Sequence, residues 1–180
     1  MQKNWLVINL NKKYFLKAGN KIFNCQIGSG GLKNPLKKIE GDQATPIGKW
    51  CLISLYYRPD RILRPKLKKK KSLKINQITK NCGWCDDTTS NYYNKYLKTN
   101  NSWSQIIHFE SLWRVDNAYD ILIVISYNIK PTIKNKGSAI FLHCSFLDNR
   151  STSGCVAIKK RDLIYLLKTL ERNTYIKIKN

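Results

Sequence analysis

Acidic residues and long apolar runs are what this sequence most clearly lacks. Only 11 Asp and Glu residues stand against 33 Lys and Arg, which gives the 180-residue chain a formal net charge of +22. No stretch approaches the roughly 18 apolar residues of a transmembrane helix. The apolar run near the amino terminus, Trp5–Leu10, is shorter than the core of a secretory signal, about 7–15 apolar residues, and no small-residue cleavage site follows it. The sequence therefore shows no membrane span and no recognisable signal peptide.

Histidine is also scarce, which limits the metal sites that the chain can offer. There are two histidines and six cysteines. Cys82 and Cys85 have the C-x-x-C spacing shared by zinc half-sites and redox dithiols, but no second pair completes a set of four zinc ligands. Their neighbours are typical of a loop, whereas a redox dithiol is expected at a strand-to-helix junction. We favour structural cysteines, and a redox pair and a metal half-site remain open.

Short apolar or alternating segments predict a mainly β protein. With 42% hydrophobic residues the chain can bury one sizeable core, so we expect a single domain over residues 1–180. One helix is predicted where leucines recur at i, i+3, i+4 and i+7, from Leu163 to Leu170, and a weaker helical pattern covers Trp103–Trp113. The expected architecture is a β-sandwich or barrel with one or two flanking helices. The predicted strands are Trp5–Leu10, Lys13–Leu16, Lys21–Ile27, Lys49–Tyr56, Ala118–Ser126, Ser138–His143 and Thr174–Ile178.

One histidine ends an apolar run shortly before a Gly-Cys pair. Alternation along a strand that ends at His143 places Phe141 and His143 on one face, and Gly154 leads into a second short apolar run that begins at Cys155. If the two runs are neighbours, the imidazole and the thiol can face each other. An imidazole raises the thiolate fraction of a cysteine and carries its proton, as cysteine acyl transfer requires. Because Gly154 permits close approach, the amide of Cys155 and a neighbouring amide can form an oxyanion hole.

Three other interpretations remain open at this point. Cys155 and His143 also fit a small buried apolar residue and a hydrogen-bonded core histidine. His108 has no comparable partner nearby in the sequence, and we expect it to be structural. The lysine-rich stretch 66–74 predicts a solvated basic loop or, in a non-enzymatic protein, the contact surface of a polyanion-binding module. A thiol oxidoreductase would use Cys82 and Cys85.

Two segments of the sequence resemble one enzyme family. Thr152–Cys155, reading TSGC, follows His143 with eleven residues between the histidine and the cysteine, and Glu40–Trp50 reads EGDQATPIGKW. Both are similar to motifs of the L,D-transpeptidases with a YkuD-type catalytic domain, and the letters GCVAI resemble a compact subgroup that reads GCVAL. The resemblance covers essentially the whole chain. It departs from the common pattern at Cys144, where glycine is usual, and at Ala157, where arginine is frequent.

The resemblance implies a YkuD-like fold and a peptidoglycan L,D-transpeptidase. By this likeness, the Cys155 thiolate attacks an L,D peptide bond of a stem peptide, and His143 protonates the leaving amine as a thioester forms. The amides of Gly154 and Cys155 hold the oxyanion, and an amine of a second stem then completes the cross-link. Attack by water would make the protein an L,D-carboxypeptidase. The family also implies stem peptides as partners, no metal or organic cofactor, and a cell-envelope or periplasmic location; we expect a monomer without a specific nucleic-acid partner.

Candidate substrate-binding residues follow from the carboxylates of such stems. A guanidinium binds a carboxylate through two parallel hydrogen bonds, so arginines are selected, and aromatic side chains are candidate walls of the cleft, although buried core positions are the alternative for them. The candidates are Arg58, Arg61, Trp84, Tyr127, Arg150, Thr152 and Ser153.

Two further expectations concern residues that shape the site. In the Glu40–Trp50 segment, the motif residues Asp42 to Gly48 are expected to form a turn rather than to touch substrate. His143 is expected to be oriented by the backbone around Cys144 or by a group such as Ser138.

Overall fold

Strands make up most of the regular structure, which confirms the predicted mainly β class. The computed structural model describes residues 4–11, 13–67, 73–100, 106–146, 148, 150–171 and 173–179. A single α-helix, α1 (Lys160–Leu167), and one 3₁₀ turn (Pro35–Lys37) accompany the strands in this part of the chain. The strands are β1 Asn4–Leu10, β2 Lys13–Ala18, β3 Lys21–Gln26, β4 Leu32–Lys33, β5 Thr45–Pro46, β6 Gly48–Tyr57, β7 Lys74–Gln77, β8 Cys82–Cys85, β9 Tyr96–Lys98, β10 Phe109–Ser111, β11 Ile121–Ile125, β12 Phe141–Cys144, β13 Val156–Ile158 and β14 Tyr175–Ile178.

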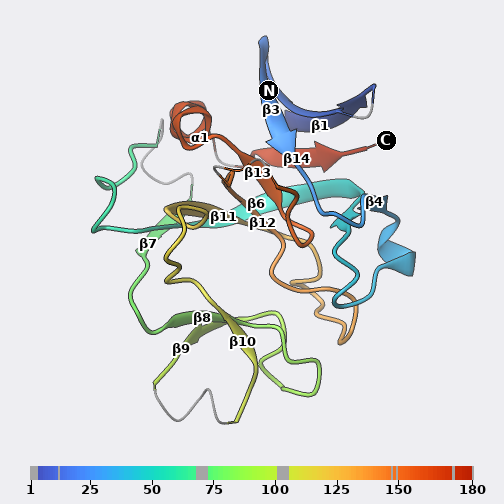
Figure 1. The fold of residues 1–180 in the computed structure, drawn as a ribbon, viewed down its shortest axis with the longest axis vertical. Helices are drawn as coiled ribbons and strands as arrows, with labels where there is room; N and C mark the ends of the chain where they lie inside the picture. The colour runs from blue at the N-terminus through green and yellow to red at the C-terminus, as the bar shows by residue number, and fades with distance from the viewer. Residues whose placement is uncertain are drawn as a thin grey trace.

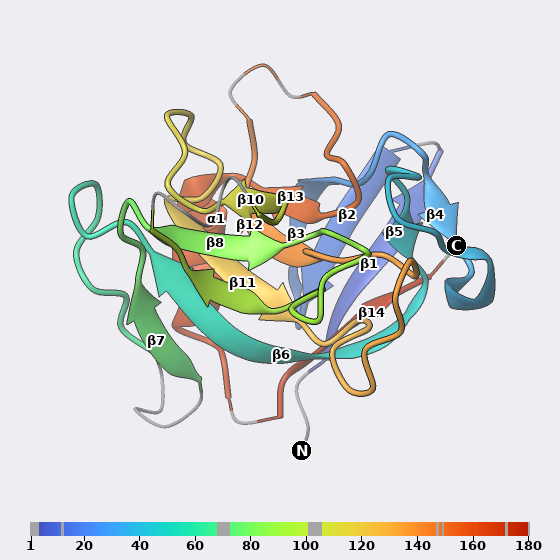
Figure 2. The same cartoon turned by 90° about the horizontal axis from the view of Figure 1, so that it is seen from below.

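Nine of these strands form one sheet that closes on itself. Their order is β11-β12-β13-β3-β2-β1-β14-β6-β7, and β6 also pairs antiparallel with β11, with Tyr57 opposite Ile121. The sheet is therefore a barrel-like ring with β7 added beside β6. Figure 2 shows β6 as the long curved strand that runs along the lower side of the ring. The predicted opening meander is confirmed, because β1, β2 and β3 pair in sequence.

One apolar core lies on the side of the sheet where α1 packs. The helix contributes the apolar face that its leucine spacing predicts. This face packs in one core with side chains of the ring, such as Val7, Leu142 and Val156. An eight-residue helix is too short to be stable by itself, so this buried face holds it in place. All four leucines are buried: Leu163, Leu166, Leu167 and Leu170. The helix ends at Leu167, so Leu170 reaches the core from the turn that follows and not from the helix as predicted.

A second, three-stranded sheet lies against the other face of β11 and β12. Its order is β10-β8-β9, and Figure 1 shows it at the opposite end of the molecule from β1. Leu122 and Phe141 pack there with Trp84 of β8, whereas Ile123 and Leu142, their neighbours in sequence, belong to the first core. Because both faces are covered, every residue of β11 is buried.

The small sheet contains one local sequence prediction that is confirmed and one that is wrong. The residues on both sides of the Cys82–Cys85 pair are loops, as predicted, and the pair itself lies in strand β8 with all four residues buried. The weak helical prediction over Trp103–Trp113 fails at Phe109–Ser111, which is β10, and residues 101–105 lie outside the described part of the chain. Pairing with β8 decides the conformation of β10, because nonlocal contacts override weak local propensity.

Three other sequence expectations have different outcomes. Residues 68–72 of the lysine-rich stretch lie outside the described residues. The single-domain organisation of residues 1–180 stays a prediction. No helix in the described ranges has the length and apolar character needed to cross a membrane.

Candidate active site

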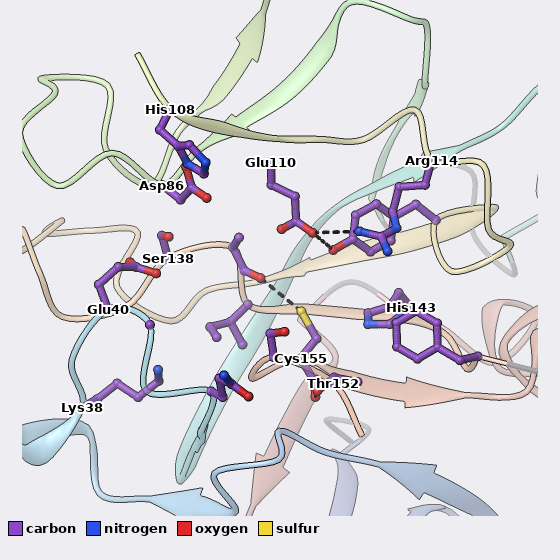
Figure 3. A pocket seen from close by; sticks show the side chains of 17 residues that line it. Lys38, Glu40, Asp86, His108, Glu110, Arg114, Ser138, His143, Thr152 and Cys155 are labelled. Carbon is purple, nitrogen blue, oxygen red and sulfur yellow. Dashed lines mark hydrogen bonds and ion pairs between the residues drawn. The ribbon is translucent and has the colours of Figure 1, made fainter. Parts of the chain in front are cut away.

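A pocket of about 380 Å³ lies between the large sheet and the small sheet. Its floor comes from residues 38–43, from β12 and the residues around it, and from the loop before β13. Its roof comes from Asp86 just after β8 and from β10 with the residues on either side of it. Figure 3 shows the floor and roof side chains on opposite sides of the opening. The lining residues are Lys38, Glu40, Gly41, Gln43, Asp86, His108, Glu110, Arg114, Tyr119, Ser138, Ala139, Ile140, His143, Phe146, Thr152, Ser153 and Cys155.

The large sheet brings His143 and Cys155 together in this pocket. Strands β12 and β13 are parallel neighbours, with His143 opposite Ala157, so Cys155 lies beside the start of β12. The backbone amide of Phe141 donates to Sγ of Cys155 at 3.3 Å, and Sγ lies 3.1 Å from the carbonyl of Ala139. His143 is two residues along from Phe141 and therefore on the same face. In Figure 3 the imidazole is directed toward the Cys155 side chain.

A backbone carbonyl fixes the tautomer of His143. Its Nδ1 lies 2.8 Å from the carbonyl oxygen of Cys144, and a carbonyl can only accept, so Nδ1 carries the proton and Nε2 is the unprotonated nitrogen of the neutral ring. The rings of Tyr119 and Phe146 pack edge-on against the imidazole, with centroids 5.3 and 5.9 Å away. Of the two orienting groups considered from the sequence, the backbone of Cys144 is the one that contacts the ring, and no contact to Ser138 is present.

Burial keeps both groups uncharged in the resting protein. His143 is 2% exposed, and burial lowers its pKa to about 4. Cys155 is 7% exposed; burial raises the pKa of its thiol, and the negative charge of Glu110 raises it further. At neutral pH the site therefore holds a neutral imidazole and a neutral thiol.

Two threonine hydroxyls hold the loop that carries Cys155. Thr45 Oγ1 donates to the carbonyl of Gly154 at 2.8 Å and accepts from the amide of Gly28 at 2.9 Å. Thr152 Oγ1 donates to the carbonyl of Cys155 at 2.6 Å. Gly154 has a φ of +128°, and a Cβ there would lie 3.1 Å from the carbonyl oxygen of Ala44, so only glycine fits without strain. The two motif segments thus meet across the pocket floor.

The Glu40–Trp50 segment forms the turn that delivers Thr45. Asp42 accepts from the amides of Ala44 and Ile39, at 2.9 and 3.1 Å, and pairs with Lys38 at 2.5 Å. Burial alone would raise the pKa of Asp42, but the hydrogen bonds from Lys38 and the two amides hold it at about 2. This geometry agrees with the expected turn.

The backbone amides of Gly154 and Cys155 are the two candidate oxyanion donors of the site. The amide of Gly154 donates to Thr152 Oγ1 at 3.3 Å, a long hydrogen bond that a stronger acceptor can displace. The amide of Cys155 belongs to the residue that carries the thiol, so it lies next to any carbonyl that Sγ attacks.

Three predicted substrate-binding residues are buried elsewhere. Arg58 stacks on the Trp113 ring, 3.6 Å from its centroid, and pairs with Asp60. Trp84 donates from Nε1 to Asn94 and packs against a core aromatic ring, and Tyr127 donates its hydroxyl to the carbonyl of Lys136. None of the three lines the pocket, and their hydrogen-bonding groups are already used.

Of the four remaining predicted residues, two line the pocket, one lies beside it and one does not line it. Thr152 and Ser153 line it. Arg150 is outside the lining, with its guanidinium 4.1 Å from the centroid of Phe146, a lining residue. Arg61 is taken up in an ion pair with Asp120 at 2.9 Å.

The roof of the pocket contains charged residues that the sequence reasoning missed. Arg114 and Glu110 line it, and so does His108, whose Nδ1 lies 2.6 Å from Asp86. His108 is thus a pocket residue with a partner far away in sequence. The sequence pattern of this segment was weakly helical, so it predicted a helix where the structure has strand β10 and gave no indication of these pocket residues.

Cys82 and Cys85 are free and buried, and neither lines the pocket. Cys82 Sγ contacts the hydroxyl of Tyr96 at 3.1 Å and that of Thr79 at 3.3 Å. Within the described ranges, no group of three or more His, Cys, Asp or Glu side chains could hold a metal ion.

Comparison with known proteins identifies the family. The YkuD family model, described as the L,D-transpeptidase catalytic domain, matches residues 3–178. Comparison with curated protein sequences finds no match. Among solved structures, L,D-transpeptidase 1 of Mycobacterium tuberculosis is similar over 99% of this chain at 9% identity, with a TM-score of 0.43, and the chain spans 61% of that protein. Because the family model covers nearly all of the sequence, the chain belongs to the YkuD family of L,D-transpeptidase catalytic domains.

Proposed function

We propose that the protein is a peptidoglycan L,D-transpeptidase that uses Cys155 as nucleophile and His143 as general base and acid. The observation that carries this proposal is the tautomer of His143, which leaves Nε2 unprotonated and able to accept the thiol proton inside a pocket shared with Cys155. A neutral imidazole is the form that a general base requires, and the lowered pKa of His143 keeps it in that form at neutral pH.

The first half of the reaction forms a thioester. Nε2 of His143 takes the thiol proton while Sγ of Cys155 attacks the carbonyl carbon of an L,D peptide bond. The negative charge on the carbonyl oxygen is met by the amides of Cys155 and Gly154, which Thr45 and Thr152 hold in place. The C–N bond breaks, and His143 returns the proton to the departing amine.

The second half transfers the acyl group to an amine of another stem peptide. His143 is neutral again and accepts a proton from the attacking nitrogen, the C–S bond breaks, and the proton passes to Sγ. Water in place of the amine would give L,D-carboxypeptidase activity, which is the alternative outcome on the same site.

Charge suits the proposed substrate class. The pocket lining includes the cations Lys38 and Arg114, and stem peptides carry carboxylates. Thr152, Ser153 and Arg150 lie at or beside the pocket and stay candidates for binding the donor. The net charge of +22 favours association with an anionic polymer, which agrees with a cell-envelope or periplasmic partner.

Digestion of purified muropeptides tests the proposal. Wild-type protein should convert them to products whose masses correspond to new cross-links or to trimmed stems, and Cys155→Ala should produce neither. The masses also show whether the donor is cut after its first or its third residue. A protein that binds muropeptides without converting them, with affinity that falls steeply with salt and is the same in Cys155→Ala, would instead be a polyanion-binding module.

A further inference from the structure

Glu110 is one of three carboxylates in the pocket of a chain that has few. The protein has 11 acidic residues in all, and Glu40, Asp86 and Glu110 line the same cavity. Glu40 accepts from the hydroxyl of Tyr93, and Asp86 is bound to His108. Glu110 projects from β10 in the roof, with Cys155 in the floor beneath it (Figure 3).

One oxygen of Glu110 is fixed by the protein and the other is not. Oε1 accepts from the hydroxyl of Tyr119 at 2.5 Å and lies 3.5 Å from a guanidinium nitrogen of Arg114. No described residue donates to Oε2, and the side chain is 27% exposed. In Figure 3 both dashed lines end on the same oxygen, and no dashed line ends on the other. A carboxylate held in this way is positioned to receive a donor from a ligand.

Glu110 is also connected to the reacting groups. The Tyr119 ring that holds Oε1 packs against the imidazole of His143, with centroids 5.3 Å apart. The negative charge of Glu110 reaches the thiol, because it raises the pKa of Cys155. A molecule that enters between roof and floor therefore meets Glu110 on one side and Cys155 on the other.

Proton balance in the second half of the reaction requires a second base. An acceptor amine with a pKa near 10.4 arrives as an ammonium at neutral pH, with only about one molecule in 10³ uncharged. It must lose two protons to become an amide N–H. His143 takes one and passes it to Sγ as the C–S bond breaks, so the other proton needs a different acceptor.

We propose that Glu110 is a catalytic residue that binds the ammonium of the acceptor through Oε2 and removes its first proton. This inference rests on the proposed transpeptidase function. The ammonium and the carboxylate become a neutral amine and a carboxylic acid, and the amine nitrogen then attacks the thioester. Burial raises the pKa of Glu110, which makes its carboxylate a better proton acceptor, and the acid later loses the proton to solvent.

Replacement of Glu110 by Gln should affect the two half-reactions in opposite directions. Gln removes the negative charge that opposes the thiolate, so acylation of Cys155 should keep its rate or become faster. Transfer to the acceptor amine should fall at least tenfold, while hydrolysis of the thioester, which needs only His143, should continue. The products should therefore shift from cross-linked stems to trimmed stems.

The experiment uses the full chain, a donor stem peptide, and a second stem peptide with a free side-chain amine as acceptor. Intact-mass analysis after rapid mixing measures acylation, and the ratio of cross-linked to trimmed product measures transfer. At pH 9.5 more of the acceptor is already neutral, so the transfer defect of Glu110→Gln should shrink relative to pH 7. A residue with only a structural role would show no such dependence.

Two variants control for charge and geometry. Asp86→Asn removes the same charge from the same pocket and should leave the product ratio unchanged, and Glu110→Asp should restore part of the transfer. An unchanged ratio in Glu110→Gln, an equal shift in Asp86→Asn, or loss of acylation in a folded Glu110→Gln protein would overturn the inference. A wild-type protein that forms no acyl-enzyme would instead contradict the proposed function itself.

Discussion

Thr45 offers a direct test of how the two sequence motifs cooperate. Its hydroxyl is fully buried and joins the amide of Gly28 to the carbonyl of Gly154, the residue before the proposed nucleophile. Thr45→Val has nearly the same shape but leaves both backbone groups without a partner. Each unsatisfied buried group costs about 1–3 kcal/mol, so we expect a loss of about 3 kcal/mol in the free energy of unfolding. Thr45→Ser keeps the hydroxyl and loses one methyl group, at a cost of about 1 kcal/mol.

Urea unfolding and thermal melting measure the difference. For a chain of this size, each kcal/mol lowers the melting temperature by about 2–4 °C, so Thr45→Val should melt roughly 6–12 °C below wild type. Because the Gly154 carbonyl is released, the acylation rate of Cys155 should fall about tenfold or more in Thr45→Val and stay within about threefold of wild type in Thr45→Ser. If Val is tolerated as well as Ser, the hydroxyl bridge is not what holds the loop.

The remaining predictions concern the histidine and the other thiols. The pKa of His143 is about 4 in the folded protein against about 6.5 in the unfolded chain, so the contribution of the neutral imidazole to the free energy of unfolding is fully present above pH 6.5 and is lost as the pH falls toward 4. Between pH 6.5 and pH 4 the free energy of unfolding of the wild type should therefore fall by about 3 kcal/mol more than that of His143→Asn. Parallel pH dependences of the two proteins would contradict this. Carbapenem treatment should add one drug mass to the wild type and none to Cys155→Ala. A simple alkylating reagent should instead react first with Cys51, because Cys51 is exposed and Cys155 is buried. Mapping of the carbapenem to Cys51 would refute the assignment of Cys155 as nucleophile. Replacement of Cys82 and Cys85 by Ser should lower stability modestly and leave muropeptide turnover within about tenfold, and complete loss of turnover in a folded double variant would show that the pair takes part in catalysis.

Local sequence pattern was sufficient for much of the large sheet and its helix. Alternating or continuous apolar residues mark β1, β3, β6 and β11, and the leucine spacing marks the buried face of α1. The neighbouring positions of His143 and Cys155 also follow from two short apolar runs that pair in parallel. Their catalytic roles stay a prediction until activity is measured.

Nonlocal contacts explain what the sequence did not reveal. Arg58 is of the residue type that binds carboxylates, but its guanidinium pairs with Asp60 and stacks on the Trp113 ring, so it lies in the interior. Glu110 lies in a segment with a weak helical pattern, and only pairing with β8 makes that segment a strand and turns the side chain toward the pocket. Pairing of this kind depends on residues far away in the chain and leaves no periodic signal of its own.

The position of β14 has a consequence for synthesis of the protein. This strand, near the carboxyl-terminal end of the sequence, lies between β1 and β6, pairing parallel with the first and antiparallel with the second. While the ribosome is still making residues 1–170, the ring has a gap at that place, and β1 and β6 each present an unpaired edge. Open edges of this kind invite pairing with other chains. A nascent or prematurely terminated chain should therefore need a chaperone until Tyr175–Ile178 closes the ring.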